Sequence, residues 1–166
     1  MTTFQHYLTV FFISMVPLIE LRGAIPFAYA FKAADPEFNL ALGYVLIAVG
    51  NMIPVPIIFF FARKVLEWGA DKPVIGGFFT FCLQKGHKGG AKLQEKAGKG
   101  LFVALMLFVG IPLPGTGAWT GTLAASILDM DFKDSILAVI CGVALAGIIV
   151  SIVCALGFGA WFGITG

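Results

Sequence analysis

Glu20 and Arg22 are the two ionisable residues that lie deep within an apolar segment, and they are the first candidates for chemistry. A charge at the centre of a bilayer costs about 2.5–3.5 kcal/mol on insertion scales, so such residues usually pair, face a cavity or mark a transport pathway. In an unwound turn they could approach each other or face one cavity. A buried Glu without a fixed cation would favour its neutral form, which suits proton coupling. A nearby Arg would hold it ionised and suit a phosphate or other polar headgroup. The alternative is a structural pair that stabilises a helical turn.

Further polar groups that could complete such a site lie where proline and glycine break two other apolar segments. Asn51, beside Pro54 and Pro56, could supply a side-chain amide. The stretch 115–120 could present amides, carbonyls and hydroxyls, although all of these groups could instead only satisfy broken backbone. The candidate residues for binding a substrate or a proton are Glu20, Arg22, Gly23, Pro26, Asn51, Pro112, Pro114, Gly115, Thr116, Gly117, Trp119 and Thr120.

The chain lacks the sequence motifs of common enzyme and cofactor sites. It has no Gly-x-Ser-x-Gly, no His-Glu-x-x-His, no paired membrane aspartates and no nucleotide-binding loop. Its cysteines, Cys82, Cys141 and Cys154, have no metal-binding or redox spacing. We therefore expect no enzyme activity, no cofactor and no metal site. Any transport would run on an ion gradient or on the gradient of the substrate itself.

The composition places these residues in a membrane protein. The 166 residues are 59% hydrophobic and 12% charged, whereas a soluble domain has about 25% charged residues. So few charges could not cover so much apolar surface in water, and we expect a single membrane domain over residues 1–166. Lipids, and no nucleic acid, are the expected partners. The first segment should remain uncleaved, because it lacks a basic n-region and leads into Glu20 rather than a small-residue cleavage site.

Basic residues are concentrated in one connecting loop, residues 63–100. This loop holds eight of the 11 basic residues, and an excess of Lys and Arg places a loop on the cytoplasmic side. The sequence thus predicts a multi-pass protein of the cell (inner) membrane with this loop inside. Lys88, Lys92, Lys96 and Lys99 recur at helical spacing, so an amphipathic segment could bind anionic lipid headgroups. A solvated linker would fit the same pattern.

The apolar segments are of two kinds. They cover about 7–31, 38–62, 101–128 and 136–162. The second and fourth reach the roughly 20 residues that a spanning helix needs. The first is interrupted around Glu20 and the third at 110–117, where prolines disfavour helix and glycines permit a tight turn. These two segments predict re-entrant helical hairpins that turn at mid-depth. A single kinked spanning helix from each is the alternative.

Short motifs recur between the two halves of the chain. Pro17-Leu18 recurs as Pro112-Leu113, and Gly23-Ala24 recurs as Gly117-Ala118. Residues 1–62 and 101–166 therefore predict two repeats, each a hairpin followed by a spanning helix. Since each repeat crosses once, the second enters from the opposite side, as in inverted-repeat transporters. The expected fold class is an all-α membrane protein of two inverted repeats. Four simple transmembrane helices, slightly favoured by the positive-inside rule, are the alternative.

Two stretches resemble the signature motifs of the bacterial and archaeal small multidrug export protein family. They are Pro17–Pro26, PLIELRGAIP, and Gly110–Gly121, GIPLPGTGAWTG. The resemblance covers nearly the whole chain, including the basic loop. The family is distantly similar to the DedA membrane proteins, which implies paired re-entrant hairpins and movement of lipid carriers such as undecaprenyl phosphate, often with proton coupling. DedA-like proteins also carry functional arginines in their second half, whereas this chain has no Arg after Arg63.

We therefore predict a secondary transporter or lipid flippase that exports a small amphipathic or lipid-linked substrate, with proton coupling as one option. Its site would lie where the hairpin tips meet. Glu20 and Arg22 would bind the substrate headgroup or a proton, and the turn at 110–117 would form the opposing wall. Because one chain supplies only two spans, we expect a homodimer. The rival hypothesis is a non-transporting membrane assembly or stress factor that acts through its basic loop.

Overall fold

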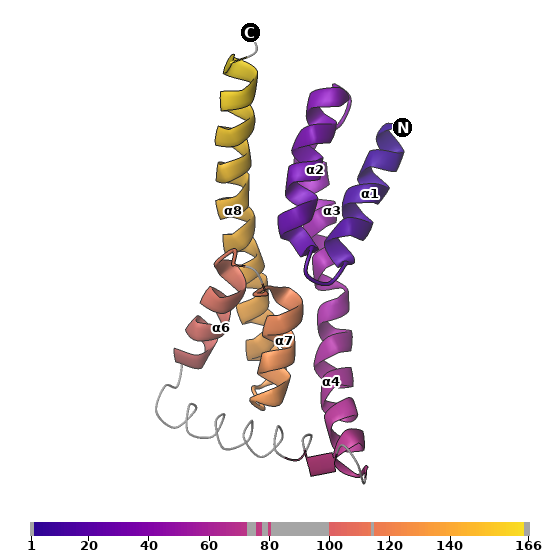
Figure 1. The fold of residues 1–166 in the computed structure, drawn as a ribbon, viewed down its shortest axis with the longest axis vertical. Helices are drawn as coiled ribbons and strands as arrows, with labels where there is room; N and C mark the ends of the chain where they lie inside the picture. Colours follow the sequence, from indigo (N-terminus) through magenta and orange to yellow (C-terminus); the bar gives the residue numbers. More distant parts are fainter. Residues whose placement is uncertain (1, 73–75, 78–79, 81–99, 114, 165–166) are drawn as a thin grey trace.

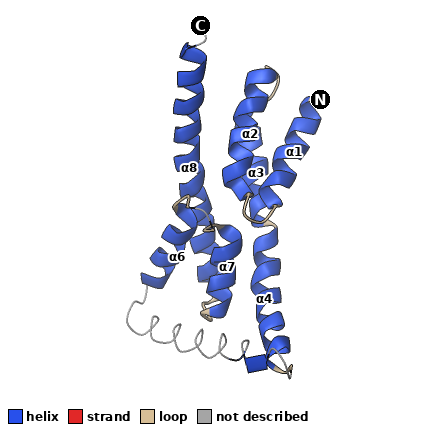
Figure 2. Cartoon of the chain, in the orientation of Figure 1, coloured by secondary structure: helices blue, strands red, loops and turns tan. Residues whose placement is uncertain are grey.

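The computed structural model of the chain describes residues 2–72, 76–77, 80, 100–113 and 115–164. These residues form an all-helical fold, and no strand occurs among them (Figure 1, Figure 2). The helices are α1 (Thr3–Met15), α2 (Glu20–Ala34), α3 (Leu40–Met52), α4 (Pro54–Ala70), α6 (Gly100–Gly110), α7 (Ala118–Ile127) and α8 (Phe132–Ile164). The lysines assigned to a lipid-binding surface, Lys88, Lys92, Lys96 and Lys99, lie outside the described residues, as does Pro114.

The first broken segment forms two helices that fold back on each other, α1 and α2 (Figure 1). Helix α1 starts with a capping box between Thr2 and Gln5 and ends before Val16, which is extended because Pro17 disfavours helix in the residue before it. Leu18 and Glu20 then adopt positive φ angles of 69° and 51°, which reverse the chain. We refer to α1, α2 and the turn between them as hairpin 1.

The third segment breaks in the same way, into α6 and α7, which we refer to as hairpin 2. Its turn uses the glycines as the sequence predicts, because Gly115 and Gly117 have φ angles of 81° and 148°. The Thr116 hydroxyl closes the turn by donating to the carbonyls of Ile111 and Leu113, each at 2.9 Å.

Two stretches are long and apolar enough to cross a membrane, and they are the two that the sequence predicts. Leu40–Ala70 covers 31 residues, with a break at Ile53 between α3 and α4 where Pro54 starts a new helix. Phe132–Gly157 covers 26 residues, and only 28% of its most apolar window is buried. Most of the apolar surface in this part of α8 therefore faces outward, where lipid is the solvent that suits it.

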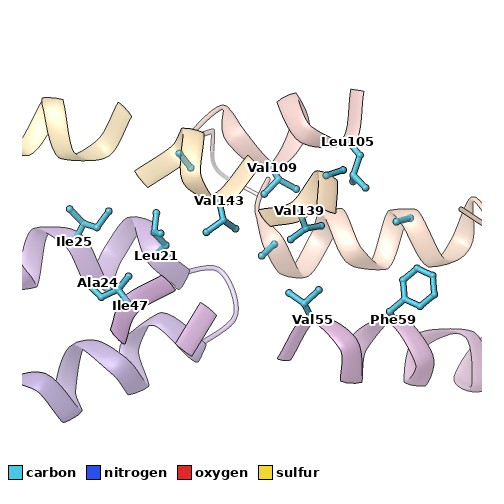
Figure 3. Packing of buried hydrophobic residues seen from close by; sticks show 14 of the residues in the cluster. Leu21, Ala24, Ile25, Ile47, Val55, Phe59, Leu105, Val109, Val139 and Val143 are labelled. Carbon is cyan, nitrogen blue, oxygen red and sulfur yellow. The ribbon is translucent and has the colours of Figure 1, made fainter. Parts of the chain in front are cut away.

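The hairpins approach each other from opposite ends of the molecule, and their turns meet about half way along α8 (Figure 1). Hairpin 1 packs on α3 and α8, and hairpin 2 packs on α8 and α4. The apolar core runs through this junction. Figure 3 shows it passing from Leu21 and Ile25 of α2, by Val143 of α8, to Val55 and Phe59 of α4. The core thus fixes the position of both hairpin tips.

Candidate functional site at the meeting of the hairpin tips

The Glu20 carboxylate binds the start of α7 in the other hairpin. Glu20 is the first residue of α2, and its side chain is almost completely buried, at 4% exposure. Oε2 accepts a hydrogen bond from the Ala118 amide at 2.9 Å, and Oε1 accepts one from the Trp119 amide at 3.0 Å. These amides open α7 and have no partner within their own helix. The carboxylate also lies at the positive end of the helix dipole, so it caps α7 both by hydrogen bonding and by charge.

The Arg22 guanidinium binds the other arm of hairpin 2, at the end of α6. Its Nη2 donates to the carbonyls of Val109 at 3.0 Å and Ile111 at 3.2 Å, and Nη1 donates to the carbonyl of Leu113. Carbonyls at the end of a helix lack intrahelical partners and carry the negative end of the dipole. Arg22 therefore caps α6 while Glu20 caps α7.

These five hydrogen bonds from Glu20 and Arg22 to the backbone of residues 109–119 are referred to below as the tip contact. Each charged side chain lies at a helix end whose dipole has the opposite sign, Glu20 at the start of α7 and Arg22 at the end of α6. Among the described residues no ion pair joins Glu20 to Arg22. The partners are main-chain atoms of hairpin 2, which explains how a segment without any charged side chain can receive two charges.

The turn residues of hairpin 2 contribute shape rather than side-chain ligands. Gly117 is buried, and a Cβ there would lie 2.2 Å from Glu20 Oε2, so only glycine lets the carboxylate approach. Gly115 is exposed and Pro112 is half-buried. The Thr120 hydroxyl points back to the Gly117 carbonyl at 3.5 Å, and the Trp119 indole nitrogen is buried without a hydrogen-bond partner.

Asn51, at the end of α3, lies beside the tip contact. Its side chain is 1% exposed, and its Oδ1 has no hydrogen-bond partner. A cavity of about 10 Å³ adjoins it, lined by Glu20, Leu21, Arg22, Asn51, Val109, Ala118, Val143 and Ala146. The structure thus brings together the predicted residues Glu20, Arg22 and Asn51. Two other predicted residues, Gly23 and Pro26, do not line this cavity: Gly23 packs against Ile19, and Pro26 lies half-buried within α2.

A much larger cavity of about 630 Å³, open to the molecular surface, lies between α2, α3 and α8, and the sequence reasoning missed it. Its lining residues are Leu21, Tyr29, Tyr44, Ala48, Met52, Ile140, Val143, Ala144, Gly147, Ile148, Ser151 and Ile152. None of them is charged, and the Tyr29 hydroxyl donates to the Ser151 carbonyl at 3.3 Å. Binding sites for small molecules typically enclose about 300–1,000 Å³ of mostly apolar space with a few polar groups. Tyr29, Tyr44 and Ser151 carry hydroxyl groups in otherwise apolar segments, and this is the sequence feature that could have pointed to the cavity.

A second polar cluster joins the open end of hairpin 1 to the connector that follows it. His6 Nδ1 lies 3.1 Å from Asp35 Oδ2, and the His6 ring stacks on Phe31 with 4.3 Å between ring centroids. The Thr3 hydroxyl donates to Asp35 at 2.8 Å and the Glu37 amide donates at 3.0 Å. The hydrogen bond from Thr3, followed by those from Glu37 and His6, lowers the pKa of Asp35 below its usual value. This cluster ties α1 to the end of α2.

Comparison with known proteins gives one finding. The model of a family described as "Putative small multi-drug export protein" matches residues 20–149. The matched region begins at Glu20 and therefore contains every residue of the tip contact, Asn51 and most of the lining of the larger cavity. No curated protein and no solved structure matches the chain significantly.

Proposed function

Because the chain belongs to the small multi-drug export protein family, we propose that it is a membrane exporter of small amphipathic or lipid-linked molecules. The family description names export, and two stretches of the chain are apolar and long enough to span a bilayer. An exporter needs a space for its substrate and an element that opens and closes that space. The larger cavity suits the first role, and the tip contact suits the second.

We propose further that the two hairpins are re-entrant and belong to two inverted repeats, residues 1–62 and 101–166. The helix packing supports this arrangement. The first arm of each hairpin packs on the span of its own repeat, α1 on α3 and α6 on α8. The second arm contacts the span of the other repeat, α2 on α8 and α7 on α4. With the loop 63–100 on the cytoplasmic side, hairpin 1 enters from outside and hairpin 2 from the cytoplasm.

The tip contact is the observation that carries the proposal. It is the place where the two hairpins hold each other, and it depends on charge. Protonation of Glu20 would turn one carboxylate oxygen into a donor that faces an amide donor of α7, so one of its two hydrogen bonds would be lost. It would also remove the negative charge from the positive end of α7. A proton on Glu20 would therefore loosen the contact, and this is how we propose that proton movement is coupled to export.

The cavity and the tip contact share part of their walls. Leu21 and Val143 line both the larger cavity and the small cavity beside Glu20. Movement of α2, which carries Leu21 and Glu20, would therefore change both at once. The uncharged lining suits an apolar substrate body, and Arg22 is the group that could meet an anionic head when the tips separate. Large apolar side chains at the rim of the cavity, Ile140, Ile148 and Ile152, are exposed, and we propose that a second copy covers them in a homodimer.

Flux through proteoliposomes tests the proposal, with a fluorescent lipophilic cation and a fluorescent short-chain phospholipid as separate probes. We expect the wild-type protein to move at least one of them faster under an imposed pH gradient. Glu20→Gln should insert normally and lose the response to the gradient. The control Glu37→Gln changes an exposed carboxylate outside the tip contact and should behave as wild type.

The two probes distinguish the two substrate classes. Movement of the phospholipid would indicate a lipid flippase, whereas movement of the lipophilic cation alone would indicate export of small amphipathic molecules. Wild-type vesicles that move neither probe above the level of protein-free vesicles would contradict the proposed function. A gradient response that survives in Glu20→Gln would contradict the proposed coupling through this residue.

A further inference from the structure

The buried Asn51 side chain carries an unpaired acceptor, Oδ1, and lines the small cavity beside the tip contact. At 1% exposure Asn51 has no access to bulk water, and its Oδ1 has no partner in the protein. An unsatisfied buried acceptor is destabilising, and native structures usually satisfy such groups with protein or with an internal water. The small cavity that Asn51 lines is the space where such a partner can be held.

The size of that cavity fits one water molecule. Its volume is about 10 Å³, close to the roughly 10–15 Å³ that a single water needs on this measure. A water also needs two to four polar partners, since a cavity lined only by apolar groups stays empty. Five of the eight residues that line the cavity are apolar, and the other three, Glu20, Arg22 and Asn51, carry the polar groups that could serve as these partners.

The hydrogen bonds left unused at the tip contact match those of a water. Asn51 Oδ1 is free to accept. Each oxygen of the Glu20 carboxylate accepts one amide hydrogen bond and can accept another. Arg22 has five N–H donors, and its bonds to hairpin 2 use three of them. A water can therefore donate to Asn51 and to Glu20 while it accepts from Arg22.

A water fits the site better than a cation does. The lining holds one carboxylate and one guanidinium, so it offers no net negative charge. Hard cations prefer six or more oxygen ligands, and the side chains here supply only Asn51 Oδ1 and a carboxylate whose oxygens already accept amide bonds. The adjacent guanidinium would repel a cation as well.

We propose that one buried water occupies this cavity and bridges Asn51 to the carboxylate of Glu20 and the guanidinium of Arg22. Asn51 is then a positioning residue that joins α3 to the tip contact. The water also gives Glu20 a proton donor and acceptor that its 4% exposure otherwise denies it. That last step rests on the proposed function, whereas the water site itself does not.

The direct test is a crystal structure of the wild-type protein in a lipid phase, at a resolution that shows ordered waters. We expect one density peak within hydrogen-bond distance of Asn51 Oδ1 and of the Glu20 carboxylate. An empty cavity, or an Asn51 side chain turned to a protein partner, would overturn the proposal. This readout needs no transport, so it can fail or succeed independently of the proposed export.

Thermal unfolding in detergent gives the second test. Asn51→Leu has a similar size and cannot hold the water. If the water is present, the variant loses its hydrogen bonds and the midpoint falls, on the order of 3 °C for a chain of this length. If Asn51 Oδ1 has no partner at all, leucine at this position removes an unsatisfied buried acceptor and stabilises the protein. The unfolding midpoint then rises, and this result would overturn the proposal.

Ion dependence separates a water from a cation. The wild-type protein and Asn51→Asp are compared in sodium chloride and in choline chloride at equal ionic strength. We expect each protein to have the same midpoint in both salts. A midpoint that is higher in sodium, and more so for Asn51→Asp, would show a cation site and overturn the proposal.

Discussion

Removal of the Glu20 carboxylate should weaken the junction between the two hairpins by an amount that can be worked out from its contacts. In Glu20→Ala the amides of Ala118 and Trp119 lose their acceptors in a site with almost no access to water. A buried donor left unsatisfied costs about 1–3 kcal/mol, so two of them amount to about 2–6 kcal/mol. Loss of a favourable charge at the start of α7 adds about 0.3–1 kcal/mol.

The membrane lowers this figure, because the unfolded chain in lipid also finds hydrogen-bond partners. Measured side-chain hydrogen bonds between membrane helices average about 0.6 kcal/mol, with a maximum of about 1.7. Glu20 accepts two hydrogen bonds, and two bonds that each lie near the upper end of that range give an expected loss of about 2–3 kcal/mol for Glu20→Ala. Glu20→Gln keeps one acceptor and should lose less than Glu20→Ala.

Reversible unfolding in mixed micelles measures these differences, with far-UV circular dichroism as the readout. Glu37→Ala, in the exposed connector, is the matched control and should stay within about 0.5 kcal/mol of the wild type. If Glu20→Ala also stays within that limit, the two amides are satisfied by other groups and the capping role of Glu20 is refuted.

Three further predictions follow from single contacts. Gly117→Ala places a methyl group against Glu20 Oε2, at a residue whose backbone φ is 148°. This variant should therefore destabilise the protein as strongly as Glu20→Ala does. In the same unfolding assay, the double variant should be little less stable than either single variant. Ala48→Phe should leave insertion intact and reduce flux in the proteoliposome assay, because its ring would fill the larger cavity. Asp35→Asn should melt at a lower temperature than the wild type at neutral pH, and the difference should shrink in acid. The pKa of Asp35 is lower in the folded protein than in the unfolded chain. Its contribution to stability is therefore fully present at pH values above the unfolded pKa of about 3.9, and it is lost as the pH falls through the folded pKa.

Controls for these predictions come from neighbouring positions. Gly115→Ala also has a positive φ, 81°, but meets no atom within 4 Å, so its effect measures backbone strain alone. Ala41→Phe adds the same ring on an exposed part of α3 and should not change flux. Equal effects of Ala48→Phe and Ala41→Phe would show that the larger cavity does not hold the substrate. A difference between Asp35→Asn and wild type that stays constant from pH 7 to about pH 3 would contradict the role of Asp35.

The broken helices could be predicted from sequence because their causes are local. Pro17 forces Val16 out of the helix, and Gly115 and Gly117 supply positive φ angles, so each break is written in the residues that form it. Glu20 and Arg22 could be selected because charges are rare in apolar segments. Asn51 could be selected for a similar reason, although only the structure shows that its acceptor is unpaired.

The partners of the two charges could not be predicted, because they are backbone atoms. The predicted break at 110–117 indicates that some amides and carbonyls there are free, but every residue has both groups, so the sequence does not show which of them Glu20 and Arg22 reach. They become available only when α6 ends and α7 begins beside hairpin 1. The larger cavity was missed for a related reason. Tyr29, Tyr44 and Ser151 lie in three different segments, and their proximity depends on the packing of α2 and α3 against α8.

The central claim is that the hairpins enter from opposite sides and meet tip to tip, and cysteine accessibility tests it most directly. Ala33 and Asp131 are exposed and lie at the open ends of hairpins 1 and 2, respectively. Each is changed to Cys in a variant whose native cysteines are replaced, and intact cells are treated with a membrane-impermeant maleimide. We predict that Ala33→Cys is labelled from outside and that Asp131→Cys is labelled only after the membrane is opened. Labelling of both from outside would indicate four simple spans and contradict the account.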